Sequence, residues 1–121
     1  MTLFHLTHVG LGGFFGAITR FSITQIMKKL NLQFPLATLT VNLLGSFILG
    51  FIIGSNLNET LTLLIGTGFL GAFTTFSTFK LDSIQLMKNK KKGLFSIYTI
   101  ISYVGGISLA LIGILTGQFL L

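Results

Sequence analysis

Long uncharged apolar stretches dominate this sequence, and each is about as long as a membrane helix must be. A helix needs ~20 residues to cross about 30 Å of hydrocarbon. Only 8% of the 121 residues are charged, whereas an ordinary soluble domain is about one quarter charged. The sequence therefore predicts an all-α membrane protein with four transmembrane helices, which we expect at residues 4–27, 34–53, 59–87 and 93–119.

Composition narrows the possible functions further. Mean hydropathy is +0.90, and four spans leave no room for a second domain, so residues 1–121 are expected to form a single transmembrane domain in contact with membrane lipid. The net charge of +6 does not indicate a nucleic-acid partner in so apolar a chain, because an excess of lysine in cytoplasmic loops explains it better. The chain has no cysteine, which excludes disulfides and thiolate metal sites.

The lysines also predict the orientation of the chain. Two expected loops, 28–33 and 88–92, contain six lysines, whereas loop 54–58 contains none. Basic loops stay on the cytoplasmic side of a cell membrane. We therefore expect both basic loops in the cytoplasm and both termini outside. The six loop lysines are Lys28, Lys29, Lys88, Lys90, Lys91 and Lys92.

The third span contains an unusual run, because residues 68–79 read GFLGAFTTFSTF. Glycines and paired threonines weaken a helix, and non-helical backbone at membrane depth persists only where it is buried in protein or lines a wet cavity. We therefore expect a break in the third helix near residues 71–75. The break frees carbonyl oxygens, which suit a small cation, and Gly71 and Thr74 flank it. One chain supplies too few oxygens for a closed site, but a two-fold partner could complete it.

Small and polar residues follow one face of the second span at intervals of four: Thr38, Asn42, Ser46 and Gly50. Asn42 is the costly member, because an amide in hydrocarbon needs hydrogen-bond partners. The stripe is explained either by an interhelical hydrogen bond, which is common in membrane bundles, or by a pore lining. Together with the interrupted third span, it favours a pore.

Glycines and other small residues also recur four apart in several spans. Such spacing lets helix backbones approach closely in lipid, but glycine is common in membrane helices generally. Real contacts and chance are therefore equally good explanations. The spaced sets are Gly12/Gly16, Ser46/Gly50/Gly54 and Gly113/Gly117.

A pore of this composition suits an anion. Amides and hydroxyls offer donors without a fixed negative charge, and phenylalanine offers the positive edge of its ring. Phe76 and Phe79 share a face if the helix resumes there. The only acidic residues, Glu59 and Asp82, lie near the ends of the third span, so a proton relay at mid-depth is not expected. No nucleophile–base pair is visible, and we do not expect an enzyme.

Three motifs together resemble the Fluc (CrcB) family of small fluoride channels over essentially the whole chain. They are GGFFGA at 12–17 followed by Arg20, PLATLTVNLLGSFILG at 35–50, and the run at 68–79. The resemblance implies four-helix subunits that pair antiparallel and form two fluoride pores and one central sodium site. It further implies passive fluoride efflux across the bacterial plasma membrane, which protects the cytoplasm from fluoride toxicity.

The resemblance also implies roles for individual residues. Backbone carbonyls of Gly71 and Thr74 correspond to the ligands of a structural sodium ion at the dimer interface. Arg20 corresponds to an arginine near the aqueous vestibule. The residues implied along the fluoride pore are Asn42, Phe76, Phe79, Thr38, Ser77 and Thr78.

Several alternatives stay open. An antiparallel homodimer needs nearly balanced lysine and arginine in its loops, whereas this chain is strongly one-sided, so its partner is either a second copy or an oppositely oriented homologue. In the fourth span, Ser102, Tyr103 and Ser108 compete for the family's polar contact. A small four-helix multidrug-type exporter would need the missing intramembrane acid. A noncatalytic membrane assembly subunit would not explain Asn42 together with the threonine-rich run.

Overall fold

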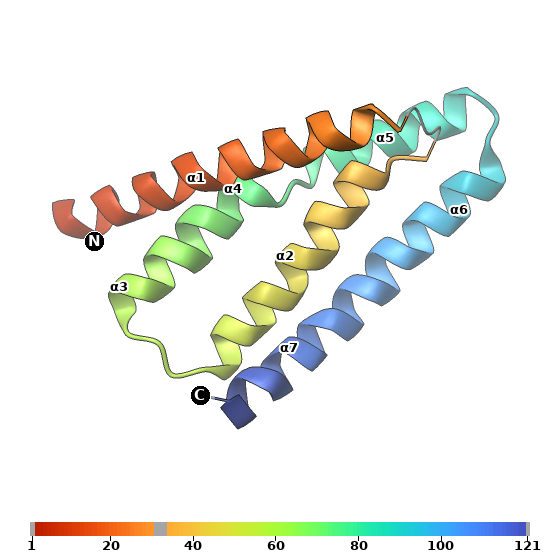
Figure 1. Ribbon diagram of the computed structural model, residues 1–121. Coiled ribbons are helices and arrows are strands. Elements are labelled where there is room, and N and C mark those ends of the chain that lie inside the picture. Colours follow the sequence, from red (N-terminus) through yellow and green to blue (C-terminus); the bar gives the residue numbers. More distant parts are fainter. Residues whose placement is uncertain (1, 31–33, 121) are drawn as a thin grey trace.

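The computed structural model of the chain describes residues 2–30 and 34–120, which form a bundle of long helices (Figure 1). The first two spans are single helices, α1 (Leu3–Lys28) and α2 (Leu36–Gly54). Of the expected loop 28–33, residues 31–33 lie outside the described residues.

The third and fourth spans are each assembled from several helical pieces. The third runs through α3 (Glu59–Leu61), the π-helical segment η1 (Thr62–Leu70) and α4 (Gly71–Phe73), and resumes after a break as α5 (Ser77–Lys88). The pieces of the fourth span are α6 (Lys92–Ile100), the π-helical segment η2 (Ile101–Gly105) and α7 (Gly106–Leu120). Each of the four helical stretches begins and ends within two residues of the expected bounds.

Three helical stretches in the described part of the chain are long and apolar enough to cross a membrane, which agrees with an all-α membrane protein. α1 has 26 residues, which is enough for a span, but His5, His8 and Arg20 make it less apolar. Its place as the remaining span stays a prediction. The three apolar stretches are Leu36–Gly54, Glu59–Lys88 and Lys92–Leu120.

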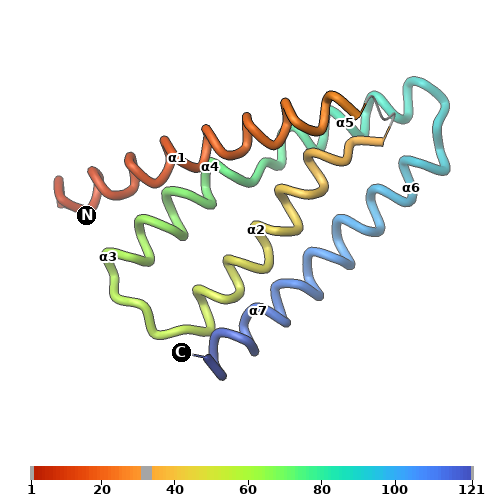
Figure 2. The backbone as a smooth tube through the Cα atoms, in the orientation of Figure 1, coloured from red at the N-terminus to blue at the C-terminus, as the bar shows by residue number. Residues whose placement is uncertain are grey.

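The ends of the helices gather at two opposite ends of the bundle. Figure 1 shows both termini and the α2–α3 connection at one end. The end of α1, the start of α2 and the α5–α6 turn lie at the other end, and the tube in Figure 2 follows the same path. The lysine-rich loops therefore lie at the same end of the bundle, as the sequence predicted.

Glycine brings α1 into backbone contact with η1. A Cβ on Gly12 would meet the carbonyl oxygen of Leu64, and a Cβ on Gly16 would meet that of Phe69. Only glycine allows so close an approach, because any side chain would occupy the space of the neighbouring backbone. We call this contact and its counterpart between α2 and α7 the glycine seams.

The second glycine seam joins α2 to α7, which are far apart in sequence. Glycines on each helix face backbone of the other, so the contact is reciprocal. The small-residue spacing seen in the sequence therefore marks real helix contacts. The facing pairs are Gly50 with Ala110, Gly54 with Ile114, Gly113 with Phe47, and Gly117 with Phe51.

Gly12→Ala is expected to destabilise the bundle by about 1–3 kcal/mol, because the added methyl group overpacks the seam against Leu64. Gly10→Ala is the matched control on the same helix, since a Cβ there meets no atom of residues 2–30 or 34–120 within 4 Å. It should be neutral or stabilising by up to about 1 kcal/mol. Thermal unfolding in detergent measures the difference, and equal melting temperatures for the two variants would contradict the seam.

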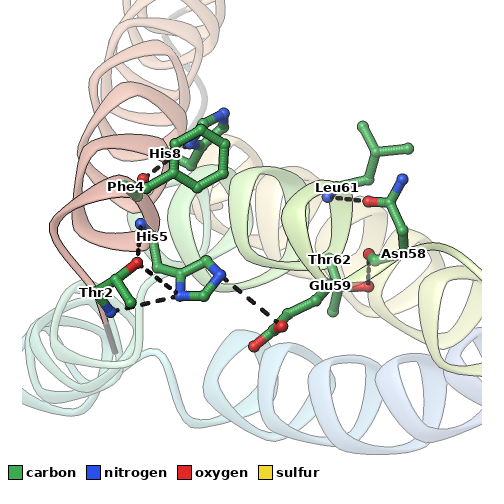
Figure 3. Close-up of polar contacts among 8 residues, drawn as sticks. All are labelled: Thr2, Phe4, His5, His8, Asn58, Glu59, Leu61 and Thr62. Atoms are coloured by element: carbon green, nitrogen blue, oxygen red, sulfur yellow. Dashed lines mark hydrogen bonds and ion pairs between the residues drawn. The ribbon is translucent and has the colours of Figure 1, made fainter.

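Polar caps fix the end of the bundle that carries the N-terminus (Figure 3). The Thr2 hydroxyl accepts from the His5 N–H at 3.3 Å and begins α1. The Asn58 side chain accepts from the Leu61 N–H at 2.8 Å and begins α3. His5 Nε2 lies 3.8 Å from Glu59 Oε2, so the starts of the first and third spans are adjacent.

Candidate functional site

The break in the third span lies at residues 74–76, between α4 and α5. Thr74 is extended, with φ −85° and ψ 159°. The break begins later than the sequence suggested, because Gly71 is still helical, with φ −60° and ψ −33°. Glycine weakens this helix without ending it. Thr74 still donates both its N–H, at 3.0 Å, and its hydroxyl, at 2.9 Å, to the Leu70 carbonyl, and the helix ends there because its ψ turns the following backbone away.

Asn42 of α2 supports the broken segment directly. Its Nδ2 donates to the Thr75 carbonyl at 2.9 Å, and its Oδ1 accepts from the Thr75 N–H at 2.9 Å. One side-chain amide thus satisfies both backbone polar groups of a residue that has left the helix. The two explanations of the polar stripe are therefore compatible, since Asn42 makes an interhelical hydrogen bond and also lines a cavity.

A cavity of about 410 Å³ opens beside the break. Its size is that of a small-molecule site, and its walls combine apolar side chains with a few polar groups. The fourth span contributes Ser102 and Tyr103 from η2, whereas the described lining does not include Ser108. Five residues expected from the sequence meet here: Asn42, Gly71, Thr74, Phe76 and Phe79.

The two phenylalanines occupy different environments, although both line the cavity. Their ring centroids are 6.0 Å apart. Phe79 is 7% exposed and belongs to the core, where the Tyr103 ring meets it edge to face at 5.8 Å. Phe76 is 63% exposed, and Lys80 Nζ lies 5.3 Å from its ring centroid. The positive charge of Lys80 on the face of this ring makes the space around the ring more attractive to an anion.

The hydroxyls after the break gather around Thr75. Its hydroxyl donates to Thr78 Oγ1 at 3.2 Å and lies 3.4 Å from Ser77 Oγ. Ser77 and Thr78, which the sequence assigned to the pore, are not among the lining residues in the described part of the chain. Both are linked to the cavity lining through the Thr75 hydroxyl.

Thr38 also lies away from the cavity, at the basic end of the bundle. It is 8% exposed, and its hydroxyl donates to Asp82 Oδ2 at 2.8 Å. The fully buried Tyr98 donates its hydroxyl to the same oxygen at 3.4 Å. Sequence reasoning missed this cluster of three residues. A signal was present, since Asp82 follows Phe79 by three positions and Thr78 by four, which places it on the same face of α5.

Arg20 reaches the break from α1. Its Nη1 donates to the Thr74 carbonyl at 3.4 Å, so the guanidinium approaches a residue of the cavity wall. Arg20 and Lys80 thus bring two positive charges close to the cavity without a carboxylate in its described lining. Such a field favours an anion over a cation.

An all-α membrane protein with an interrupted helix and a donor-lined cavity belongs to the class of channels and transporters for small ions. A family model for "CrcB-like protein, Camphor Resistance (CrcB)" matches residues 7–114. The chain belongs to the CrcB family.

Three relatives illustrate how much of the chain is shared. It is 53% identical over 110 residues to "Fluoride-specific ion channel FluC 2" of Bacillus thuringiensis subsp. konkukian, covering 90% of this chain and 93% of the relative. It is 44% identical to a FluC 1 of Geobacillus kaustophilus, covering 91% and 95%. It is 43% identical to a FluC 1 of Listeria monocytogenes serotype 4b, covering 90% and 93%. The similarity therefore covers about nine tenths of the chain.

Proposed function

We propose that this chain is a subunit of a fluoride-selective ion channel, which lets fluoride leave the cell passively and lowers fluoride toxicity in the cytoplasm. The observation that carries the proposal is the Asn42 amide, which lines the cavity while it holds the broken helix. The relatives support the choice of ion, because they are named fluoride-specific ion channels. Their names favour neither an enzyme nor the exporter and assembly-subunit alternatives.

The cavity chemistry explains why fluoride is the ion proposed. A small anion with a strongly held hydration shell needs donors that replace its water. Asn42 and the Ser102 hydroxyl offer such donors, and the rings of Phe76 and Phe79 offer positive edges. Nearby Arg20 and Lys80 lower the cost of bringing a negative charge into the bundle.

Ion efflux from liposomes tests this proposal. Purified protein reconstituted in liposomes loaded with potassium fluoride should release fluoride rapidly once valinomycin carries potassium out. Chloride-loaded liposomes should release their anion far more slowly, and protein-free liposomes should release neither. Equal fluoride and chloride rates, or an absolute requirement for a proton gradient, would refute a passive fluoride channel.

The dimer and the orientation belong to the same proposal. The chain lies in a bacterial plasma membrane, with both termini outside the cell and the lysine-rich end facing the cytoplasm. An antiparallel partner, which is a second copy or an oppositely oriented homologue, completes the channel. A cysteine placed at Asn89 in the α5–α6 turn should resist labelling from outside intact cells, whereas one placed at Asn56 should react. Equal labelling at both positions would instead indicate insertion in both directions.

Sodium is proposed as a structural ion at the dimer interface, held by the carbonyls of Gly71 and Thr74. Carbonyl oxygens are suitable hard ligands, and Gly71 has open space beside it. The Thr74 carbonyl, which also accepts from Arg20, belongs to non-helical backbone. Replacing sodium by N-methyl-D-glucamine should lower the melting temperature of the dimer. An unchanged melting temperature would argue against the ion.

A further inference from the structure

Thr75 forms more cross-span polar contacts than its unremarkable place in the sequence suggests. Its N–H and its carbonyl both bond to the Asn42 side chain at 2.9 Å, across 33 residues of sequence. Its hydroxyl accepts from the Thr78 N–H at 3.2 Å and donates to Thr78 Oγ1 at 3.2 Å. One residue therefore links α2, the break and the first turn of α5.

The paired bonds fix which way the Asn42 amide faces. With Nδ2 donating to the Thr75 carbonyl and Oδ1 accepting from the Thr75 N–H, both bonds form. A flipped amide would set oxygen against oxygen and N–H against N–H, and both bonds would be lost. Nδ2 carries two N–H groups, of which Thr75 takes one. One Nδ2 N–H is therefore left to meet an ion in the cavity, while Oδ1 already accepts from the Thr75 N–H.

The hydroxyl of Thr75 sets the start of α5. That helix begins at Ser77, and the residue before it, Phe76, makes no side-chain cap. The Thr78 N–H is one of the unpaired donors of the first turn, and the Thr75 hydroxyl satisfies it. Phe79 lies on α5. Thr75, which orients the Asn42 amide, therefore also fixes the start of the helix that carries the Phe79 ring.

We propose that Thr75 is a specificity-determining positioning residue, which acts through Asn42 and α5 rather than by binding the ion itself. Its backbone N–H and carbonyl ensure that Asn42 presents an N–H to the cavity, and its hydroxyl holds the amide and the rings in a fixed relative position. This inference rests on the proposed fluoride function. It adds that selectivity against larger anions depends on a residue whose main contacts are with protein.

Three variants test the inference in the liposome assay. Thr75→Val preserves shape but lacks the hydroxyl, and it should conduct fluoride about tenfold more slowly with a smaller fluoride-to-chloride ratio. Thr75→Ser, which keeps the hydroxyl, should restore most of both values. Thr116→Val is the matched control, because among the described residues that hydroxyl bonds to Ile112 of its own helix alone, and both values should match the unmodified protein.

The outcomes separate this inference from the proposed function. If the unmodified protein does not conduct fluoride, the proposed function fails. If it does conduct and Thr75→Val retains both its rate and its selectivity, the positioning role of Thr75 is wrong. A uniform loss of rate with unchanged selectivity in Thr75→Val would show a capping role alone and would also overturn the inference.

A measurement on the unmodified protein covers the case in which Thr75→Val does not fold. In 15N spectra of the detergent-solubilised dimer, one side-chain N–H of Asn42 should exchange slowly with solvent and the other faster. The Asn56 side chain, in an exposed loop position, supplies the reference for free exchange. Two equally fast Asn42 protons would show that Thr75 does not hold the amide.

Discussion

Asn42→Asp is expected to reduce fluoride efflux by about a hundredfold or more. The substitution replaces a donor by an oxygen at the atom that now bonds the Thr75 carbonyl at 2.9 Å. That carbonyl loses its partner, which costs about 1–3 kcal/mol, and an ionised carboxylate also repels the permeating anion. Both effects act on the proposed pore, so the expected loss exceeds that of removing one contact.

The control for this variant is Asn56→Asp, which makes the same chemical change in the exposed α2–α3 loop. Its efflux should equal that of the unmodified protein in the liposome assay. Each variant should also elute from size-exclusion chromatography as the unmodified protein does. Normal fluoride efflux by Asn42→Asp would remove Asn42 from the permeation pathway.

Phe76→Ile should reduce fluoride efflux by about tenfold while leaving the stability of the bundle unchanged. The ring is 63% exposed in the subunit, so its replacement leaves no core cavity. Isoleucine keeps an apolar side chain but removes the positive ring edge and the contact with Lys80. Phe79 is a poorer probe, because at 7% exposure its truncation would also disturb packing.

Phe21→Ile supplies the matched control, since Phe21 on α1 is 65% exposed and lies away from the cavity. Melting temperature and efflux are measured for both variants. A Phe76→Ile protein that melts normally and conducts fluoride at the original rate would show that this ring only packs.

The lengths of the helical stretches agree with the sequence because a bilayer imposes the length of an apolar helix, whereas the place of α1 as a fourth span stays a prediction. The presence of the break also followed, since glycine and paired threonine are poor helix formers. Its position did not. Propensity points to Gly71, whereas the helix ends at Thr74, and Asn42 of α2 bonds the backbone N–H and carbonyl of the next residue, Thr75. That partner lies 33 residues away in the sequence, so local propensity does not reveal where the break falls.

The site residues followed from the sequence in part. The stripe that includes Thr38 and Asn42 was visible from its spacing, but a period gives only the face of a helix and not what lies opposite. Thr38 meets Asp82, and Asn42 meets backbone of Thr75. The latter pairing joins a side chain to a peptide group, and the sequence carries no pattern for such a bond.

The same limit applies to the glycine seams. The spacing of the glycines was visible in the sequence, but it did not predict that α2 packs against α7 and α1 against η1. Roles in fluoride binding, sodium binding and dimer formation remain proposals, which the efflux, melting and labelling experiments address.

The α2–α7 seam also has a consequence for how the chain is made. A ribosome delivers α2 to the membrane long before α7, so the glycine face of α2 enters lipid without the helix that will cover it. The interval between the synthesis of Asn42 and that of its partner Thr75 is shorter, because Thr75 follows after 33 residues. During synthesis the amide can therefore find its permanent partner while the bundle is still open. Closure of the subunit is a late event, which requires α7 to leave the ribosome.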